Sequence, residues 1–193
     1  ITQPILNDLC YQYKYDNRNR LVEKKLPGKQ WEFIVYDKLD RPVATGPALS
    51  PFSDITAPGW NITKYDAFSR PVITAWLSGE ATTAGRKSLQ ETLNGSTGNF
   101  NETKTAAANT AINGVAFRYS SLAWPTAGYH VLAVNYFDDY DYPDAPSVPA
   151  AVADGTQPVY YNNTIKPKGL ATGSWTRILE TSTAYRNELS YTL

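Results

Sequence analysis

The chain has 193 residues, with 18 Lys or Arg and 18 Asp or Glu, so its formal net charge is zero. A neutral chain gives no electrostatic reason to expect nucleic acid or an anionic membrane as a partner, and no stretch has the length and apolarity of a transmembrane helix or signal peptide. Fourteen Tyr, five Trp and six Phe, with Gly and Pro spread along the chain, favour a β protein with many turns. The length suits one domain or a piece of something larger, and the start at Ile1 without any Met favours a fragment of a longer protein.

Alternating side chains predict the first strands. Residues 9–15 place Tyr11, Tyr13 and Tyr15 on one face, and the chain returns after a tight turn. The same out-and-back pattern occurs twice more, with a Pro-rich loop at 47–59 before the third copy. The predicted strands up to this point are 9–15, 21–26, 31–36, 42–45, 60–65 and 72–77.

An eight-residue pattern occupies each of these three turns. It is Tyr-Asp, three residues, Arg, an apolar residue and Val, at 15–22, 36–43 and 65–72. The Asp carboxylate can accept backbone N–H groups of the turn, and the Arg can reach back to it, an ion pair worth under about 1 kcal/mol unless shielded. The residue before Arg would most comfortably be Gly, since positive φ is expected there; the chain has Asn19, Asp40 and Ser69. Pro42 and Pro71 suit the first residue of a strand.

The next segment, 78–114, differs from the hairpins. Thr83 to Leu93 predicts a short helix that ends before Gly95. For the Asn- and Thr-rich run 94–113 three interpretations stand: a mobile loop, a second short helix around Lys104 to Thr110, or partial disorder. Strands resume afterwards, at 115–119, 128–137, 159–161, 174–181 and 186–193, with a Pro- and Ala-rich loop at 143–158.

Few residues suggest chemistry. Cys10 is the only cysteine, which excludes an internal disulfide and favours a small buried side chain. His130 is the only histidine and lies in mid-strand, so a structural role is favoured over a Ser-His-Asp triad or a zinc site. The acidic run Asp138 to Asp144 offers oxygen ligands for Ca²⁺ without the spacing of an EF-hand, and a solvated turn is favoured. No catalytic, cofactor-binding or metal-binding residue is therefore predicted.

The three motif copies resemble the YD repeats of RHS-repeat proteins. Residues 128–140, GYHVLAVNYFDDY, and 168–179, KGLATGSWTRIL, are similar to stretches of the large RHS/YD proteins of Bacteroidetes-type bacteria. The resemblance spans roughly residues 9 to 193. The chain departs from the family pattern in lacking the turn Gly in all three copies.

This resemblance implies a secreted or surface-exposed, very large polypeptide whose hairpins spiral into a sheet that closes as a hollow shell. In the family the shell encloses a C-terminal toxin or effector. Autoproteolysis there belongs to a separate core segment that nothing in this chain matches, so no catalytic residue is carried over. In a bacterial protein the sequons at Asn61, Asn94, Asn101 and Asn162 would carry no meaning.

The expected fold is mainly β, with antiparallel hairpins of YD-repeat type forming a curved sheet or shell segment and one or two short helices in 80–113. Within 1–193 we expect three hairpins in 1–77, a helical or irregular insertion in 78–114, and further strands in 115–193. The expected role is structural and non-catalytic, without cofactors.

The expected partners are other YD repeats of the parent chain, an enclosed C-terminal effector, and further copies that pair with open sheet edges, without nucleic acid or membrane insertion. The expected location is secreted or cell-surface. The alternative is a β-sandwich-like carbohydrate-binding or adhesion module, which needs Trp31, Trp60 and Trp76 to line an exposed groove beside Asp138 to Asp144. A hydrolase, ranked last, needs converging acids or a His dyad in a cleft.

Overall fold

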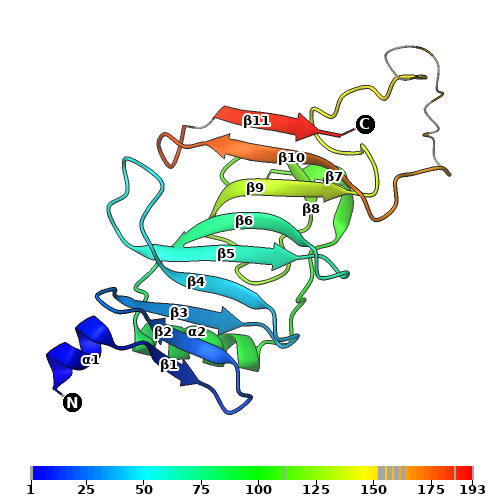
Figure 1. The fold of residues 1–193 in the computed structure, drawn as a ribbon. Coiled ribbons are helices and arrows are strands. Elements are labelled where there is room, and N and C mark those ends of the chain that lie inside the picture. The colour runs from blue at the N-terminus through cyan, green and yellow to red at the C-terminus, as the bar shows by residue number, and fades with distance from the viewer. Residues whose placement is uncertain are drawn as a thin grey trace.

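The dominant feature is an open, nine-stranded antiparallel sheet (Figure 1). It is seen in a computed structural model that describes residues 2–110, 112–151, 155, 158, 161, 164–184 and 186–192. The strand order is β1-β2-β3-β4-β5-β6-β9-β10-β11, so spatial order follows chain order except where the chain leaves the sheet after β6. The strands are β1 (Gln12–Tyr15), β2 (Leu21–Lys25), β3 (Trp31–Tyr36), β4 (Pro42–Ala48), β5 (Gly59–Tyr65), β6 (Pro71–Ser78), β9 (His130–Phe137), β10 (Ala171–Ile178) and β11 (Arg186–Tyr191).

The three predicted hairpins are confirmed as β1–β2, β3–β4 and β5–β6. Each pair carries a β-bulge beside its turn, between Lys14 and Tyr15 in the first hairpin. A bulge increases the local twist of the strands. The mainly β fold is therefore as predicted, and the sheet remains open rather than closing on itself.

The segment between β6 and β9 covers one face of this sheet. Figure 1 shows helix α2 (Thr83–Gly95) and the small sheet of β7 (Lys104–Asn109) and β8 (Phe117–Tyr119) lying behind the large sheet. The predicted helix is confirmed, and Thr82 caps it by accepting the Gly85 N–H at 3.1 Å. The second helix proposed for 104–110 is wrong, because these residues pair with β8 as a strand.

The core lies between the sheet and this covering segment. Phe33, Val35, Ile62 and Val134 of the sheet are buried together with residues from the covering segment, namely Leu93, Ile112, Val115, Phe117, Tyr119 and Tyr129. Burying a large apolar side chain contributes about 1.5–3 kcal/mol, so the covering segment supplies much of the apolar stabilisation. A short helix that the sequence did not predict, α1 (Gln3–Leu9), precedes β1 and buries none of its residues.

A second, smaller cluster consists of Ala48, Phe52 and Trp76, with the partly buried Ile55 and Leu132 beside them. Phe52 belongs to the loop between β4 and β5, which packs its ring against Trp76 at 6.0 Å. Gly59 is required here, because a Cβ atom at this position would lie 2.5 Å from the Trp76 ring. The Pro-rich loop predicted at 47–59 is thus an ordered part of the packing.

Candidate functional site: the ladder of turns

One edge of the molecule carries the three hairpin turns, and all three have the same construction. We call them the first turn (Asp16–Arg20), the second turn (Asp37–Arg41) and the third turn (Asp66–Arg70). In each, the Asp N–H donates to the Arg carbonyl at 3.0 Å. The residue before Arg donates its N–H back to the Asp carbonyl at 3.0, 3.2 and 3.0 Å respectively. That residue has a φ of 59° to 61° in all three, so the positive φ expected at Asn19, Asp40 and Ser69 is confirmed.

The Asp side chain holds each turn closed. Its Oδ1 accepts the backbone N–H groups of the residues two and four positions further along, at 2.9–3.0 Å. Its Oδ2 accepts the Nε–H of the Arg that ends the turn, at 2.8, 2.8 and 2.6 Å. A shorter or neutral side chain could not satisfy three donors at once, which explains the Asp in every copy.

Each Arg also reaches the next hairpin. The guanidinium carbon lies 4.7 Å from the ring centroid for Arg20 over Tyr36 and for Arg41 over Tyr65. The Tyr hydroxyl returns the contact, since Tyr36 donates to the Leu21 carbonyl and Tyr65 to the equivalent Pro42 carbonyl, both at 2.8 Å. Cation–π contacts of this kind contribute about 0.5–2 kcal/mol. The Tyr of the motif therefore receives the Arg of the preceding turn, and we call the resulting series the ladder.

Shielding separates the second turn from the others. The side chains of Arg41 and Asp37 are 9% and 3% exposed, against 12% and 15% for the pair in the first turn. Arg41 also donates to the Phe100 carbonyl at 2.7 Å and to Asn101 Oδ1 at 2.9 Å. Under this cover, removing one partner would leave a buried unpaired charge, which costs more than the loss of an exposed pair.

The ladder continues into a fourth turn that the sequence did not predict. Arg70 lies over the Phe137 ring at 4.3 Å and donates to both carboxylate oxygens of Asp138, at 3.1 and 2.7 Å. The Asp138 N–H donates to the Leu170 carbonyl at 3.1 Å, as each earlier Asp does to its Arg. Gly169 precedes Leu170 with a φ of 84°, in the place of the three positive-φ residues. Residues 139–168 therefore lie between the two ends of a related turn that joins β9 to β10. It differs from the hairpin turns because Asp138 itself has a φ of 75° and because the Gly169 N–H donates to Asp138 Oδ1, at 2.6 Å, rather than to the Asp carbonyl.

The covering segment attaches where neighbouring hairpins separate. The pairing of β2 with β3 ends at Phe33 on the turn side, so Tyr36 lies beyond it. The Gln90 amide of α2 satisfies both backbone groups of Tyr36, accepting its N–H at 3.0 Å and donating to its carbonyl at 2.8 Å. At the next hairpin the Glu102 N–H donates to the Tyr65 carbonyl at 2.7 Å. Unpaired backbone groups at these positions would cost stability if left buried.

A buried polar cluster fixes the covering segment at its other side. The Lys64 ammonium group lies 2.7 Å from Glu102 Oε1, and both side chains are fully buried. Glu102 also accepts N–H groups from Leu122 and Ala123 and the hydroxyl of Ser120. Burial lowers the pKa of the Lys64 ammonium group, while Glu102 acts in the opposite direction.

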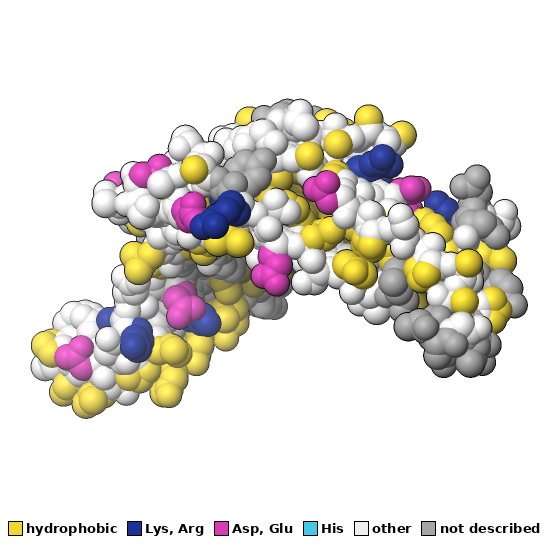
Figure 2. Space-filling model, turned by 90° about the horizontal axis from the view of Figure 1, so that it is seen from above, with side chains coloured by type: hydrophobic (Ala, Val, Ile, Leu, Met, Phe, Trp, Pro, Cys, Tyr) yellow, Lys and Arg dark blue, Asp and Glu magenta, His cyan; other side chains and the backbone are white. Residues whose placement is uncertain are grey.

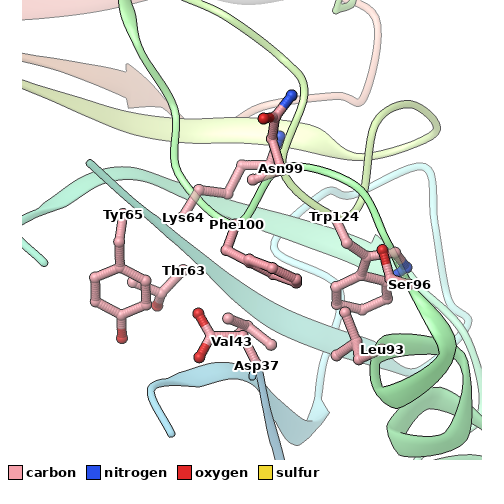
Figure 3. A pocket seen from close by; sticks show the side chains of 11 residues that line it. Asp37, Val43, Thr63, Lys64, Tyr65, Leu93, Ser96, Asn99, Phe100 and Trp124 are labelled. Carbon is pink, nitrogen blue, oxygen red and sulfur yellow. The ribbon is translucent and has the colours of Figure 1, made fainter. Parts of the chain in front are cut away.

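This cluster has the residue types of a nucleophilic site, but a substrate has no room to reach it. Lys64 Nζ is 3.1 Å from the Tyr129 hydroxyl and 3.4 Å from Ser121 Oγ, and the two oxygens are 2.7 Å apart. Burial raises the pKa of Tyr129 to about 12, and Lys64 is committed to Glu102, so neither supplies a ready base. The pocket beside Lys64, walled by Phe100 and Trp124 (Figure 3), encloses about 20 Å³, room for one water molecule.

His130 does not form a triad. Its Nδ1 is 2.9 Å from the Asn113 side-chain nitrogen, and its ring packs on Phe52 at 4.8 Å. Burial lowers the pKa of His130, and the charge of Arg177 adds to this effect. Ser182 Oγ donates directly to Asp54 Oδ2 at 2.6 Å, so no imidazole lies between the two side chains. Cys10, expected to be buried, is partly exposed.

The acidic run is engaged by cations from the protein itself. Asp138 pairs with Arg70, Asp139 with Lys104, and Asp141 lies 3.6 Å from Lys166. Hydrogen bonds from Arg70 lower the pKa of the Asp138 carboxyl group. No group of three or more His, Cys, Asp or Glu placed to hold a metal ion occurs among the described residues.

The three tryptophans on which the carbohydrate-binding alternative depends are buried or partly buried. Trp60 and Trp76 are 2% and 0% exposed, and Trp60 packs against Phe33 in the core. Trp31 is partly buried with Lys14 over its ring at 4.3 Å. The exposed groove on which the carbohydrate-binding alternative depended is therefore not formed by these side chains.

The face seen in Figure 2 carries basic, acidic and apolar side chains. Figure 2 shows the Lys and Arg side chains of that face dispersed among acidic and apolar ones rather than gathered in a basic patch. In the part of the chain that the structure describes, no helix has the length and apolarity needed to cross a membrane. Residues 159–160 and 162–163, which hold most of a predicted strand and one sequon, lie outside the described residues.

Comparison with known proteins finds no match, either among family models, among curated proteins or among solved structures. The functional argument therefore rests on the ladder and on the packing around it.

Proposed function

We propose that this chain is a structural, non-catalytic segment of a large secreted or cell-surface protein of the RHS/YD-repeat type, contributing hairpins to the wall of a shell. One observation carries this proposal: the same turn recurs at Asp16, Asp37 and Asp66 with the same hydrogen bonds. The Arg that ends each turn also lies over an aromatic ring of the strand that follows it in the sheet. A constellation built for catalysis has no need to recur, whereas a wall gains strength from each repetition.

The sizes of the pockets support a structural role. The buried Lys64–Glu102 pair lies beside a space for one water molecule, which is too small for a substrate. The larger grooves are open to solvent, such as one of about 290 Å³ lined by Glu32 of β3, Thr45 of β4 and Asn61 of β5. An enclosed C-terminal effector and neighbouring YD repeats are the partners that this proposal carries with it.

Electron cryomicroscopy of the natural open reading frame tests the proposal. We expect residues 12–191 to be continuous with further hairpins in one curved wall, and the protein to be found in the culture medium or on the cell surface. Finding these residues as a separate bead on a flexible linker would overturn it. Saturable binding to a glycan array that is abolished by Trp31→Ala would instead favour the carbohydrate-binding alternative.

A further inference from the structure

One lysine and one glutamate meet in the interior without exposure to solvent. Lys64 of β5 and Glu102 of the covering segment lie 2.7 Å apart between Nζ and Oε1, and both side chains are 0% exposed. Other Lys–carboxylate pairs are more open, since Lys14 and Lys24 are 49% and 35% exposed in theirs. Both charges of the Lys64–Glu102 pair have lost their hydration, which favours a reaction that removes the charges.

The two atoms that an amide bond would join are already close together. The Glu102 Cδ atom is one carboxyl C–O bond, about 1.2 Å, from Oε1, so it lies within about 3.9 Å of Lys64 Nζ. Bond formation starts from a separation of about 3–3.5 Å between the reacting atoms. Groups held in this way react as if they were highly concentrated, with effective molarities of about 10⁵–10⁸ M.

Hydrogen-bond donors prepare the Glu102 carboxyl group for attack. Its Oε2 accepts the Ser120 hydroxyl group and, at 3.1 Å, the Leu122 N–H. Two fixed donors on one oxygen stabilise the oxyanion of a tetrahedral intermediate. Oε1, which contacts Nζ, accepts the Ala123 N–H at 3.3 Å. Oε2 is therefore suited to remain as the amide oxygen, and Oε1 is suited to leave.

The Tyr129 hydroxyl group is placed to move protons beside Lys64. Attack needs the neutral amine, and burial lowers the pKa of the Lys64 ammonium group, although Glu102 opposes this shift. The Tyr129 hydroxyl lies 3.1 Å from Nζ and 2.7 Å from Ser121 Oγ. Burial raises the pKa of Tyr129 to about 12, so this hydroxyl stays protonated and can accept one proton while it donates another.

We propose that Lys64 and Glu102 join in an intramolecular isopeptide bond after the chain folds. The ammonium group first gives one proton to Oε1, which leaves an amine and a carboxylic acid. Nζ then bonds to Cδ, a second proton passes from Nζ through Tyr129 to Oε1, and the Cδ–Oε1 bond breaks. Ammonium and carboxylate thus become an amide and one water molecule, and no other reactant is consumed. The pocket of about 20 Å³ beside Lys64 has room for this water (Figure 3).

The bond ties β5 covalently to the covering segment. It closes a loop that contains β6 and α2, and a cross-link of this kind stabilises a fold by restricting the unfolded chain. The reaction occurs once in each chain and uses no external substrate, so the enclosed position of the cluster protects the product from hydrolysis. The inference goes beyond the proposed function and does not depend on the chain being part of a wall.

The mass of the refolded full chain tests the inference. The chain is produced in unfolded form, as inclusion bodies dissolved in urea, and is then refolded and followed by mass spectrometry. We expect the unfolded chain to have the mass of its sequence and the refolded chain to become lighter by one water molecule. Tryptic digestion should then give a branched peptide that joins Lys64 to Glu102. The exposed pair of Lys24 and Glu32, 2.8 Å apart, should give none.

Two variants distinguish this bond from other losses of water. Lys64→Met should keep its full mass, and a mass loss that persists in this variant would overturn the inference. Tyr129→Phe keeps the ion pair and should slow the mass loss at least about a hundredfold, whereas an unchanged rate would overturn the role given to Tyr129. A native chain that regains its β circular dichroism but keeps its full mass for several days would overturn the inference as a whole.

Discussion

The three hairpins of residues 12–78 and the covering segment of residues 79–129 are built on different principles. The hairpins repeat one local turn, and each contact between neighbours is also repeated. The covering segment has no repeat and is held at single points, such as Gln90 on Tyr36 and Glu102 on Lys64. The repeated hairpins therefore form the sheet. The non-repeating covering segment packs over one face of the sheet to bury the core, and it attaches where neighbouring hairpins separate.

The fourth turn shows which parts of the motif are essential. It keeps an aromatic residue, the Asp and a positive-φ residue, but has Leu170 in place of Arg and 139–168 inserted. Asp138 then pairs with Arg70 of the preceding turn instead of with its own Arg. Four predictions test these distinctions, beginning with the largest expected effect.

Replacing Lys64 with Met should destabilise the covering segment most. The Glu102 carboxylate would remain buried without its cation, and breaking a buried ion pair in this way costs about 3–5 kcal/mol. Urea unfolding measures the loss. The control is Lys24→Met, whose partner Glu32 is 46% exposed and whose loss should cost under about 1 kcal/mol. Equal effects of the two variants would show that the cluster is not an anchor.

Replacing Arg41 with Met should come next. This Arg holds the second turn, the Tyr65 ring and the covering segment at Phe100, and we expect a loss of about 2–4 kcal/mol in the free energy of unfolding. The matched control is Arg18→Met, an Arg of the first turn whose side chain is 51% exposed and pairs with Asp40. That control should change stability by less than about 0.5 kcal/mol. If Arg41→Met lowers the free energy of unfolding by less than about 1 kcal/mol, the ladder does not stabilise the protein.

The fourth turn predicts a pH dependence. Hydrogen bonds from Arg70 lower the pKa of Asp138 below its unfolded value of 3.8, so its stabilisation is present above about pH 4 and is lost as the pH falls through the folded pKa. Asp138→Asn should therefore cost about 1 kcal/mol at pH 7, and the difference from the native chain should shrink toward pH 2. Asp141→Asn, whose native side chain is 60% exposed, is the control and should cost less than about 0.5 kcal/mol at pH 7. A difference that stays constant with pH would contradict the assignment.

The smallest effect concerns the positive-φ position. Ser69→Gly should stabilise the protein by about 0.5–1 kcal/mol, because Gly adopts a φ of 61° without the steric cost that Ser incurs. Gly169→Ala at the equivalent place in the fourth turn should have the opposite sign, and no atom lies near enough to its added Cβ to complicate the result. Thermal unfolding of both variants checks this. If both variants change the stability in the same direction, the positive-φ position of the fourth turn is not equivalent to that of the other three turns.

Sequence reasoning found the regular half of the molecule because its determinants are local. Asn19, Asp40 and Ser69 could be expected at positive φ from their place before Arg, and Thr83 could be expected to begin a helix. A helix was one prediction for Lys104–Asn109 because its alanines favour that structure. The segment is a strand instead, because it pairs with β8. No local signal joins Lys64 to Glu102.

The fourth turn did leave a signal in the sequence. Phe137-Asp138 and Gly169-Leu170 match the two ends of the motif, but 30 residues separate Asp138 from Gly169, where the hairpin turns have two between Asp and the positive-φ residue. Only the coordinates bring the two ends together, through the Asp138 N–H and the Leu170 carbonyl.

The most direct test of the ladder is a pair of double-mutant cycles by urea unfolding. One cycle combines Arg41→Met with Tyr65→Leu, and the other combines Arg70→Met with Phe137→Leu. If one ladder runs through all four turns, both pairs should show a favourable coupling energy of about 0.5–2 kcal/mol. A coupling energy of zero between Arg70 and Phe137, with a favourable one between Arg41 and Tyr65, would contradict the continuation of the ladder into the fourth turn.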